Sequence, residues 1–298
     1  MLNLNFYSGE DLYSDGDIEN EILDVFEKEL DIYEVLSKDN RWPMLYHLSP
    51  ERRNLLEWYD FNKEGSLLEI GAGCGALTEL FCEKLKRIVA VELSLKRAKI
   101  IEKRCERFKN LEIIVGNFEN IEVDEKFDYI TLIGVLEYTK SFISDKEPYK
   151  FLFNKIKNLL KKGGTLIIAI ENRLGIKYWA GAREEHTGNF FEGLEGYRTD
   201  KVETFGKKEL EDLLRGSGFK ELKFYYPYPD YKLCFDIFSD EYLPIESTYL
   251  PQSPNYDSDR YVIFDEGKVL RNIIRNGLFP YFSNSFLVFA RVIEEGKK

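Results

Sequence analysis

One short stretch, LLEIGAGCGALTEL at residues 67–80, limits what this chain can fold into more than any other. It places an apolar run first, then glycines at Gly71, Gly73 and Gly75, then a helical pattern. Glycine has no Cβ, so its backbone can turn sharply and approach a ligand closely. A strand, a glycine-rich turn and a helix in this order are typical of a nucleotide-binding unit. The sequence therefore predicts that a nucleotide-containing ligand binds at this turn.

Apolar strand patterns and helical patterns alternate through the middle of the chain. The expected strands are 66–70, 87–92, 111–116, 127–134 and 164–171, and the expected helices are 76–85, 94–108 and 149–160. Ser94 is the expected N-cap of the second of these helices. Strands that are apolar throughout are buried on both faces, as in a parallel sheet covered by helices. Right-handed crossovers then give an α/β, doubly wound sheet.

The regions on either side of this alternation follow other patterns. Residues 1–65 are predicted to form an N-terminal helical cap, with an amphipathic helix over 18–36 and a second helix that Ser49 caps and Pro50 begins. The acidic residues between 10 and 34 are interpreted as a solvated helix face. Beyond 171, we expect irregular inserts at about 172–204 and 229–284, a helix at 207–218, and strands at 219–229 and 285–294.

Composition argues against several classes of function. A net charge of -11 without a basic run does nothing to neutralise phosphates, so no nucleic acid partner is expected. The four cysteines form no CxxC motif and only two histidines could join them, so no metal site is expected. The start of the chain lacks the pattern of a signal peptide, and no apolar run approaches ~18 residues. The sequence predicts a cytoplasmic protein without a membrane span.

The glycine turn alone does not choose the nucleotide. Read as G-x-G-x-x-A from Gly71 to Ala76, it fits a dinucleotide fingerprint. Read as E-x-G-x-G-x-G from Glu69, it fits the S-adenosylmethionine (SAM) turn of class I methyltransferases. Glu92 ends the next strand, where a carboxylate can accept from both ribose hydroxyls of either cofactor.

Later stretches favour SAM. FDYITLIGVLEYT closely resembles the fourth strand and following loop of class I SAM-dependent methyltransferases, and LLKKGGTLIIAIEN resembles their fifth strand. The two closing strands match the terminal antiparallel pair of that family, in which the last strand slots between its neighbours. The resemblance covers residues 66–171 and the strands near 220 and 286. It implies a 66–298 methyltransferase domain with a mostly parallel, seven-stranded, Rossmann-like sheet and inserts after strands 5 and 6.

The same resemblance implies a cofactor site for SAM, whose product is S-adenosylhomocysteine. Asn117, in VGNFENI, stands where the family usually has an Asp that binds the adenine amine, and Gly134 to Glu137 would lie beside the methionine part. The implied cofactor residues are Glu69, Gly71, Ala72, Gly73, Gly75, Glu92, Leu93, Asn117, Phe118, Gly134 and Glu137.

A looser resemblance concerns the acceptor. ENRLGIKYWAGAREEHTG, FFEGLEGY and FYYPYPDYKL are similar to stretches of bacterial methyltransferases associated with surface-polysaccharide and glycan modification. Some of those are fused to glycosyltransferases or kinase-like domains, which implies such a domain as a separate partner here. The implied activity is O-methylation of a sugar, sugar nucleotide or glycan. Small-molecule N- or O-methylation, a non-catalytic SAM-binding scaffold and a nicotinamide oxidoreductase are the alternatives.

The residues after the fifth predicted strand are the candidates for chemistry on the acceptor. His186 is the candidate general base, because an ordinary histidine pKa of ~6.5 suits proton removal near neutrality. Ordering of the insert by hydrogen bonds is the alternative role for His186. Asn172 and Arg173 are expected to bind acceptor polar groups or to cap the turn. Tyr178 and Tyr197 are expected to line the acceptor site or to pack the insert.

Overall fold

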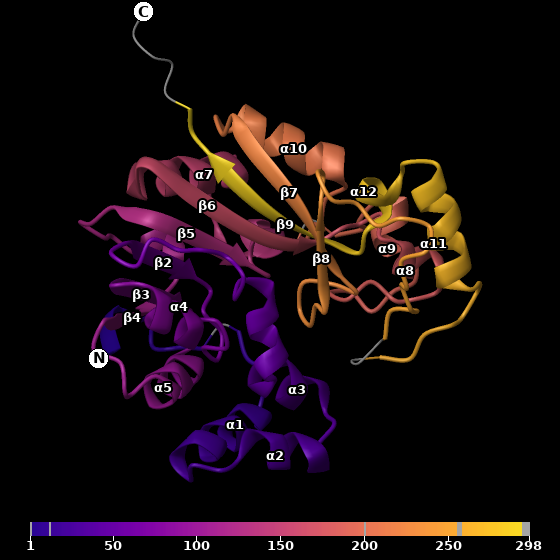
Figure 1. The fold of residues 1–298 in the computed structure, drawn as a ribbon. Coiled ribbons are helices and arrows are strands. Elements are labelled where there is room, and N and C mark those ends of the chain that lie inside the picture. Colours follow the sequence, from indigo (N-terminus) through magenta and orange to yellow (C-terminus); the bar gives the residue numbers. More distant parts are fainter. Residues whose placement is uncertain (1, 12, 200, 255–257, 294–298) are drawn as a thin grey trace, which may run out of the picture. The chain divides into compact units, whose positions relative to one another are not determined.

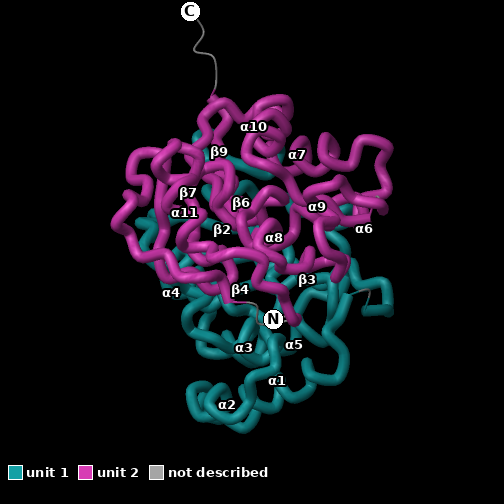
Figure 2. Tube along the Cα trace, turned by 90° about the vertical axis from the view of Figure 1, so that its right-hand side faces the viewer, with its two compact units in different colours: residues 1–132, 158–164 teal, residues 133–157, 165–298 magenta. Residues whose placement is uncertain are grey.

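The computed structural model describes residues 2–11, 13–199, 201–254 and 258–293 (Figure 1). Contacts group the chain into two compact units, residues 1–132 with 158–164 and residues 133–157 with 165–298 (Figure 2). The domains expected from the sequence, 1–65 and 66–298, follow chain order instead, and that boundary stays a prediction.

The first unit holds a parallel sheet. Its strands are β1 (Leu2–Phe6), β2 (Ser66–Ile70), β3 (Arg87–Glu92), β4 (Leu111–Gly116) and β5 (Phe127–Ile133). They lie in the order β1-β4-β3-β2-β5, and every neighbouring pair is parallel. The helix α4 (Thr78–Lys84) packs against β3, and α5 (Leu95–Arg104) packs against β3 and β4. Ser94 caps α5 by accepting from the N–H of Arg97, as predicted.

The edge strand β1 was not predicted, because residues 1–65 were expected to form a helical cap. LNLNF alternates apolar and polar residues, which is the period of a strand with one covered face. β1 runs parallel to β4, with Leu2 opposite Ile113 and Phe6 opposite Gly116. The alternation was present in the sequence, but five residues at a chain terminus are a weak signal without a visible partner strand.

The helices that follow β1 also differ from expectation. The single helix predicted over 18–36 is two helices, α1 (Ile18–Glu27) and α2 (Ile32–Lys38). The chain breaks at Glu29, whose φ is 50°, and Asp31 caps α2 by accepting from the N–H of Glu34. α3 (Trp42–Leu48) completes a small apolar core with α1. Pro50 then begins a 3-10 helix, η1 (Pro50–Leu55), but Ser49 makes no capping bond.

The second unit holds an antiparallel sheet in the order β6-β9-β7-β8. Its strands are β6 (Leu160–Glu171), β7 (Glu221–Tyr228), β8 (Asp236–Ser239) and β9 (Ser285–Arg291). The last strand, β9, pairs with both β6 and β7, which confirms that it slots between its neighbours. The described residues therefore form nine strands rather than the expected seven, because β1 and β8 extend the sheets. Position 294, expected to end the last strand, lies outside the described residues.

Half of the described helices of the second unit lie in its two inserts. The helices seen within the described residues are η3 (Leu136–Tyr138), α6 (Thr139–Phe142), α7 (Pro148–Leu159), α8 (Ile176–Trp179), α9 (Glu192–Glu195), α10 (Lys207–Gly216), α11 (Glu266–Arg275) and α12 (Phe279–Phe282). The 229–284 insert was expected to be irregular, yet it contains α11. Asp265 caps this helix by accepting from the N–H of Lys268, and Leu270 is buried.

None of the helices formed by the described residues combines the length and the apolarity needed to cross a bilayer.

The close approach of β1 to β4 gives a stability prediction. Gly116 has φ +153°, and a Cβ built on it would lie 2.5 Å from the carbonyl oxygen of Phe6. We expect Gly116→Ala to displace β1 and to lower the free energy of unfolding by about 1–3 kcal/mol. Urea denaturation measures the change, with Gly216→Ala as the control because a Cβ there meets open space. Equal stability of the two variants would contradict the prediction.

Candidate active site

The glycine turn of the first unit depends on backbone conformations that favour glycine. Gly71, Gly73 and Gly75 have φ of +74°, +58° and +79°. The N–H groups of Gly71 and Ala72 both donate to the carbonyl oxygen of Val91, at 2.9 and 3.1 Å. A Cβ at Gly73 would meet nothing within 4 Å, so its conformation, rather than lack of space, calls for glycine there. The turn is therefore fixed to β3, and the space beside the Gly73 backbone is open.

Glu92 joins this turn to the end of β3. Its carboxylate accepts from the N–H of Gly73 at 2.7 Å and from the N–H of Ser94 at 2.9 Å. The residue is buried, and this burial raises the pKa of Glu92, while Arg97 and the N–H donors oppose the rise. Two hydrogen bonds leave a carboxylate with further acceptor capacity. Glu92 thus holds the turn in shape and keeps lone pairs for a hydroxyl donor.

Glu69 lies in the same unit and faces inward. The hydroxyl of Thr78 donates to its Oε2 at 2.6 Å, which links the end of β2 to the first turn of α4. Burial raises the pKa of Glu69 to about 8, so the carboxyl is mostly protonated at neutral pH. The structure therefore gives Glu69 an internal partner.

The remaining cofactor residues predicted from the sequence fall in both units. Leu93 follows β3, and Asn117 caps η2 (Phe118–Asn120) by accepting from the N–H of Glu119 at 3.0 Å. Phe118 is buried in the same short helix. Gly134 and Glu137 belong to the second unit, so these two are not brought together with the others within one unit.

A buried ionic network of the first unit was not predicted. The guanidinium of Arg97 pairs with Asp15 and Glu19, each at 2.7 Å, and His47 Nε2 lies 2.9 Å from Asp15. Glu19 is fully buried, so the acidic run is not simply a solvated helix face as interpreted from the sequence. Its acids compensate an arginine of α5, a pairing that composition could not reveal.

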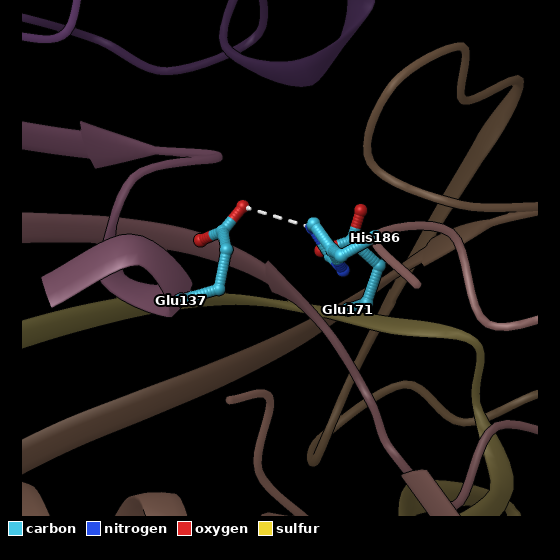
Figure 3. A group of neighbouring side chains, drawn as sticks. All are labelled: Glu137, Glu171 and His186. Atoms are coloured by element: carbon cyan, nitrogen blue, oxygen red, sulfur yellow. Dashed lines mark ion pairs between the residues drawn. The ribbon is translucent and has the colours of Figure 1, made fainter. Parts of the chain in front are cut away.

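The second unit gathers three titratable side chains from separate segments (Figure 3). Glu137 lies in η3, Glu171 ends β6, and His186 lies in the insert after β6. One ligand atom from each lies within 4.8 Å of those of the other two. His186 Nδ1 is 2.8 Å from Glu184 Oε1, and its Nε2 is 3.7 Å from Glu137 Oε1. All three side chains are almost entirely buried.

Two lysines that the sequence reasoning missed lie beside this group. The ammonium group of Lys232 forms ion pairs with the carboxylates of Glu171 and Glu185. Lys177 also forms an ion pair with Glu185. The hydroxyl of Tyr231 donates to Glu171 Oε1 at 3.2 Å. Glu171 was visible only as the polar end of an apolar strand, and no local pattern marked Lys232.

These contacts shift the protonation equilibria of the group. Burial disfavours the charged form of His186, but Glu137 and Glu184 outweigh it and raise the pKa of His186 well above its ordinary value. Burial likewise disfavours the charged form of Glu171, but Lys232 and His186 lower the pKa of Glu171 to about 2. Burial raises the pKa of Glu137. These neighbouring acids therefore favour the protonated form of His186.

The predicted acceptor residues are also in the second unit. The Asn172 amide donates to the carbonyls of Tyr281 and Ser283, and Arg173 donates to the carbonyl of Thr204. Tyr197 donates to Glu184 Oε1 at 3.1 Å and so supports the partner of His186. Asn172, Arg173 and Tyr197 thus all have internal partners. Among the described residues, Tyr178 is buried and its hydroxyl has no hydrogen-bond partner.

Part of the chain is similar to known methyltransferases. Residues 68–168 match a family model described as a methyltransferase domain. "Probable ribosomal RNA small subunit methyltransferase A" of Methanosarcina barkeri is 37% identical over 91 residues, 30% of each chain. "Malonyl-[acyl-carrier protein] O-methyltransferase" of Priestia megaterium is 28% identical over 118 residues, 39% of this chain and 40% of that one. The chain spans about a third of the length of the first curated relatives it matches.

A solved structure extends the likeness in fold. Phosphoethanolamine N-methyltransferase 1 of Haemonchus contortus, in complex with phosphoethanolamine and S-adenosylhomocysteine, matches with a TM-score of 0.50 at 13% identity. The match covers 95% of this chain and 50% of that one.

The parallel sheet of the first unit and the turn that joins β2 to α4 define a nucleotide-binding, Rossmann-like α/β fold. Residues 68–168 match a methyltransferase domain, and the cofactor that this similarity supports is SAM.

The contacts of Glu92 predict its effect on cofactor affinity. Glu92→Gln keeps the shape but removes the charge, so we expect SAM binding to weaken by about 1–3 kcal/mol. Isothermal titration calorimetry measures this, with Glu112→Gln as the control because Glu112 pairs with Arg87 at a half-exposed position on β4. Unchanged SAM affinity of Glu92→Gln would mean that the ribose binds elsewhere.

The pKa of Glu69 predicts a pH-dependent stability. Its folded-state pKa of about 8 lies above the ordinary value of 4.5, so the folded protein keeps a proton that the unfolded chain releases. Stability from this group is therefore full at low pH and is lost as the pH rises toward about 8. We expect the free energy of unfolding, relative to Glu69→Gln, to fall by up to about 1.4 kcal/mol per pH unit in this range. Urea denaturation at several pH values gives the slope of the free energy of unfolding against pH. If the curves of the unmodified protein and of Glu69→Gln were parallel, the prediction would be wrong.

Proposed function

We propose that the protein catalyses SAM-dependent O-methylation of a hydroxyl on a sugar, sugar nucleotide or glycan. The observation that carries the proposal is the histidine–carboxylate pair of the second unit. Glu184 fixes Nδ1 of His186 and leaves Nε2 directed toward the buried carboxylate of Glu137. An imidazole held in this way has one nitrogen oriented for proton transfer.

The chemistry of SAM explains what such a pair contributes. The sulfonium cofactor supplies an activated methyl group, and the protein supplies binding, alignment and exclusion of water. A hydroxyl oxygen attacks the methyl group while its proton leaves to a base, and His186 Nε2 takes that role in this proposal. Glu184 is itself held by the N–H groups of His186 and Thr187 and by the hydroxyl of Tyr197. These three hydrogen bonds therefore fix the orientation of the Glu184 carboxylate.

The surroundings of the pair support a polar acceptor. The buried hydroxyl of Tyr178 has no partner among the described residues and would take a hydrogen bond from an acceptor. Arg173 and Asn172 hold the turn after β6, and Tyr197 holds Glu184, so these three position the acceptor site rather than filling it. Resemblance of the insert to glycan-modifying methyltransferases supports a carbohydrate hydroxyl. A separate glycosyltransferase or kinase-like partner and a cytoplasmic location belong to the same proposal.

A nucleic acid acceptor is the second candidate, because several curated relatives are named ribosomal RNA methyltransferases. Their match to this chain spans only 91 to 98 residues, about a third of the chain. The net charge of -11 disfavours a polyanionic acceptor. A carbohydrate acceptor therefore remains the better supported of the two.

Labelled SAM tests the reaction directly. The protein is incubated with a panel of sugar nucleotides, glycan fragments, small amines and ribosomal RNA, and the products are read by mass spectrometry. We expect transfer to a carbohydrate oxygen. Transfer to RNA or to nitrogen would replace the proposed acceptor, and SAM binding without transfer to any acceptor would indicate a scaffold.

His186 gives a kinetic prediction. We expect His186→Ala to keep SAM affinity but to reduce kcat by about 10²–10⁴-fold, the usual contribution of a general base. Because the pKa of His186 is raised, the unprotonated form becomes common only above neutrality, so kcat should rise with pH beyond 7. Full activity of His186→Ala would remove this residue from the base role.

Glu184 provides a matched test of positioning. Glu184→Gln removes a carboxylate that raises the pKa of His186, so the midpoint of the pH–rate profile should move to lower pH. A lower rate with an unmoved midpoint would indicate a purely structural role for Glu184.

A further inference from the structure

We infer that Glu137, Glu171 and His186 form a binding site for a divalent cation, with two carboxylates and one imidazole nitrogen as ligands. This goes beyond the proposed function, in which His186 acts as a general base without a metal; in the cation-bound protein its Nε2 would be a ligand instead. The cysteine spacing that argued against a metal site does not bear on this cluster, which contains no cysteine.

The geometry of the three side chains is the first support. They come from η3, from the end of β6 and from the following insert, and one ligand atom of each lies within 4.8 Å of the others. Figure 3 shows the carboxylate of Glu137 facing the imidazole of His186, with Glu171 beside the ring. Two ligand atoms that each lie about 2.0–2.2 Å from one cation are at most about 4.4 Å apart, so small rotations of these side chains would bring the three atoms onto one cation.

Unsatisfied oxygens are the second and independent support. Oε2 of Glu137 and Oε2 of Glu171 are buried and have no hydrogen-bond partner among the described residues. Both residues are at most 1% exposed. A buried carboxylate oxygen without a donor is costly, and a cation is one group that would satisfy both oxygens at once.

The distribution of charge around the cluster is the third support. The ammonium groups of Lys177 and Lys232 are paired with Glu185, Asp230 and Glu171. In the described part of the chain, the ion pairs recorded for Glu137 and Glu184 are both with His186. One imidazole is shared by two buried carboxylates, so the cluster has more acid than its lysines and histidine compensate. A divalent cation corrects that imbalance.

The groups behind the ligands are arranged as in metal sites. Glu184 binds Nδ1 of His186, which leaves Nε2 as the nitrogen available to a metal. Tyr231 donates to the other oxygen of Glu171, and a Cβ at Gly134 would lie only 2.8 Å from the Tyr231 hydroxyl. Gly134 therefore lets Tyr231 approach and hold Glu171 in place.

The ligand set indicates the class of cation. Two carboxylates and one imidazole suit Mn²⁺, Fe²⁺ or Zn²⁺, whereas a thiolate-free site of this kind is a poor match for Cu⁺. Such a cation and a proton compete for Nε2 of His186. In the cation-bound protein, His186 would be a ligand and the metal would favour ionisation of a coordinated hydroxyl in its place.

Manganese binding tests the inference without using activity. The protein is freed of metal with a chelator and titrated with Mn²⁺, and the free ion is followed by its electron paramagnetic resonance signal. We expect one saturable site in the unmodified protein. Glu137→Gln and His186→Gln should each weaken binding by about tenfold or more, and Glu184→Gln by about tenfold, the effect typical of losing an outer partner.

Glu147→Gln is the control, because Glu147 is exposed and pairs with Lys150. Circular dichroism checks that each variant folds. If Glu137→Gln does not fold, His186→Gln alone tests the inference. Absence of saturable Mn²⁺ binding to the unmodified protein would overturn the inference. Equal binding by Glu137→Gln, His186→Gln and the control would overturn it too, because the cation would then bind elsewhere. Since no acceptor is present, these outcomes are separate from failure of the proposed methyl transfer.

Discussion

The carboxylate of Glu92 accepts hydrogen bonds from the N–H groups of Gly73 and Ser94. The conformation of the glycine turn and the start of α5 depend on these two hydrogen bonds. The first bond fixes a turn whose backbone is accessible mainly to glycine, and the second fixes the start of α5. A buried carboxylate needs such donors, because without them its desolvation would be uncompensated. Glu92 therefore shapes the turn and remains able to accept from a ligand.

Buried acids also organise what surrounds this turn. Arg97 of α5 pairs with Asp15, just before α1, and with Glu19 in the first turn of α1, and these pairs attach α1 and the preceding segment to α5. In the second unit, Glu184 orients His186, while Lys232 and Tyr231 hold Glu171. Arg97 and Glu171 are placed by partners from other segments, whereas Glu184 orients His186 from within the same insert. Buried charges need compensation, which explains why the other buried acids are paired. The same rule marks Glu137, Glu171 and His186 as a cluster whose acids are incompletely compensated.

Local patterns predicted the elements well where the signal was long or chemically specific. β2 to β6 and the helices α4, α5, α7 and α10 lie close to their predicted positions, because strand and helix periods are read from consecutive residues. β1 was missed because a terminal five-residue alternation is weak without its partner β4. The break at Glu29 was missed because the apolar spacing of α1 and α2 runs on across it. α11 was missed although Asp265 caps it, because the surrounding insert contains several prolines.

The glycine turn and Glu92 by themselves predicted a nucleotide-containing cofactor, because a strand, a turn and an acid at the end of the next strand lie within one short stretch. The choice of SAM came from the resemblance of two later stretches to class I methyltransferases. The sequence also singled out His186 and Glu137, but for different reasons and without any relation between them. Only the tertiary structure decided that these two meet Glu171, and that Lys177 and Lys232 compensate the neighbouring acids. The reason is physical. The periodicities of helices and strands are set by residues close together in the sequence, whereas buried charges are compensated by whichever segments the fold brings together.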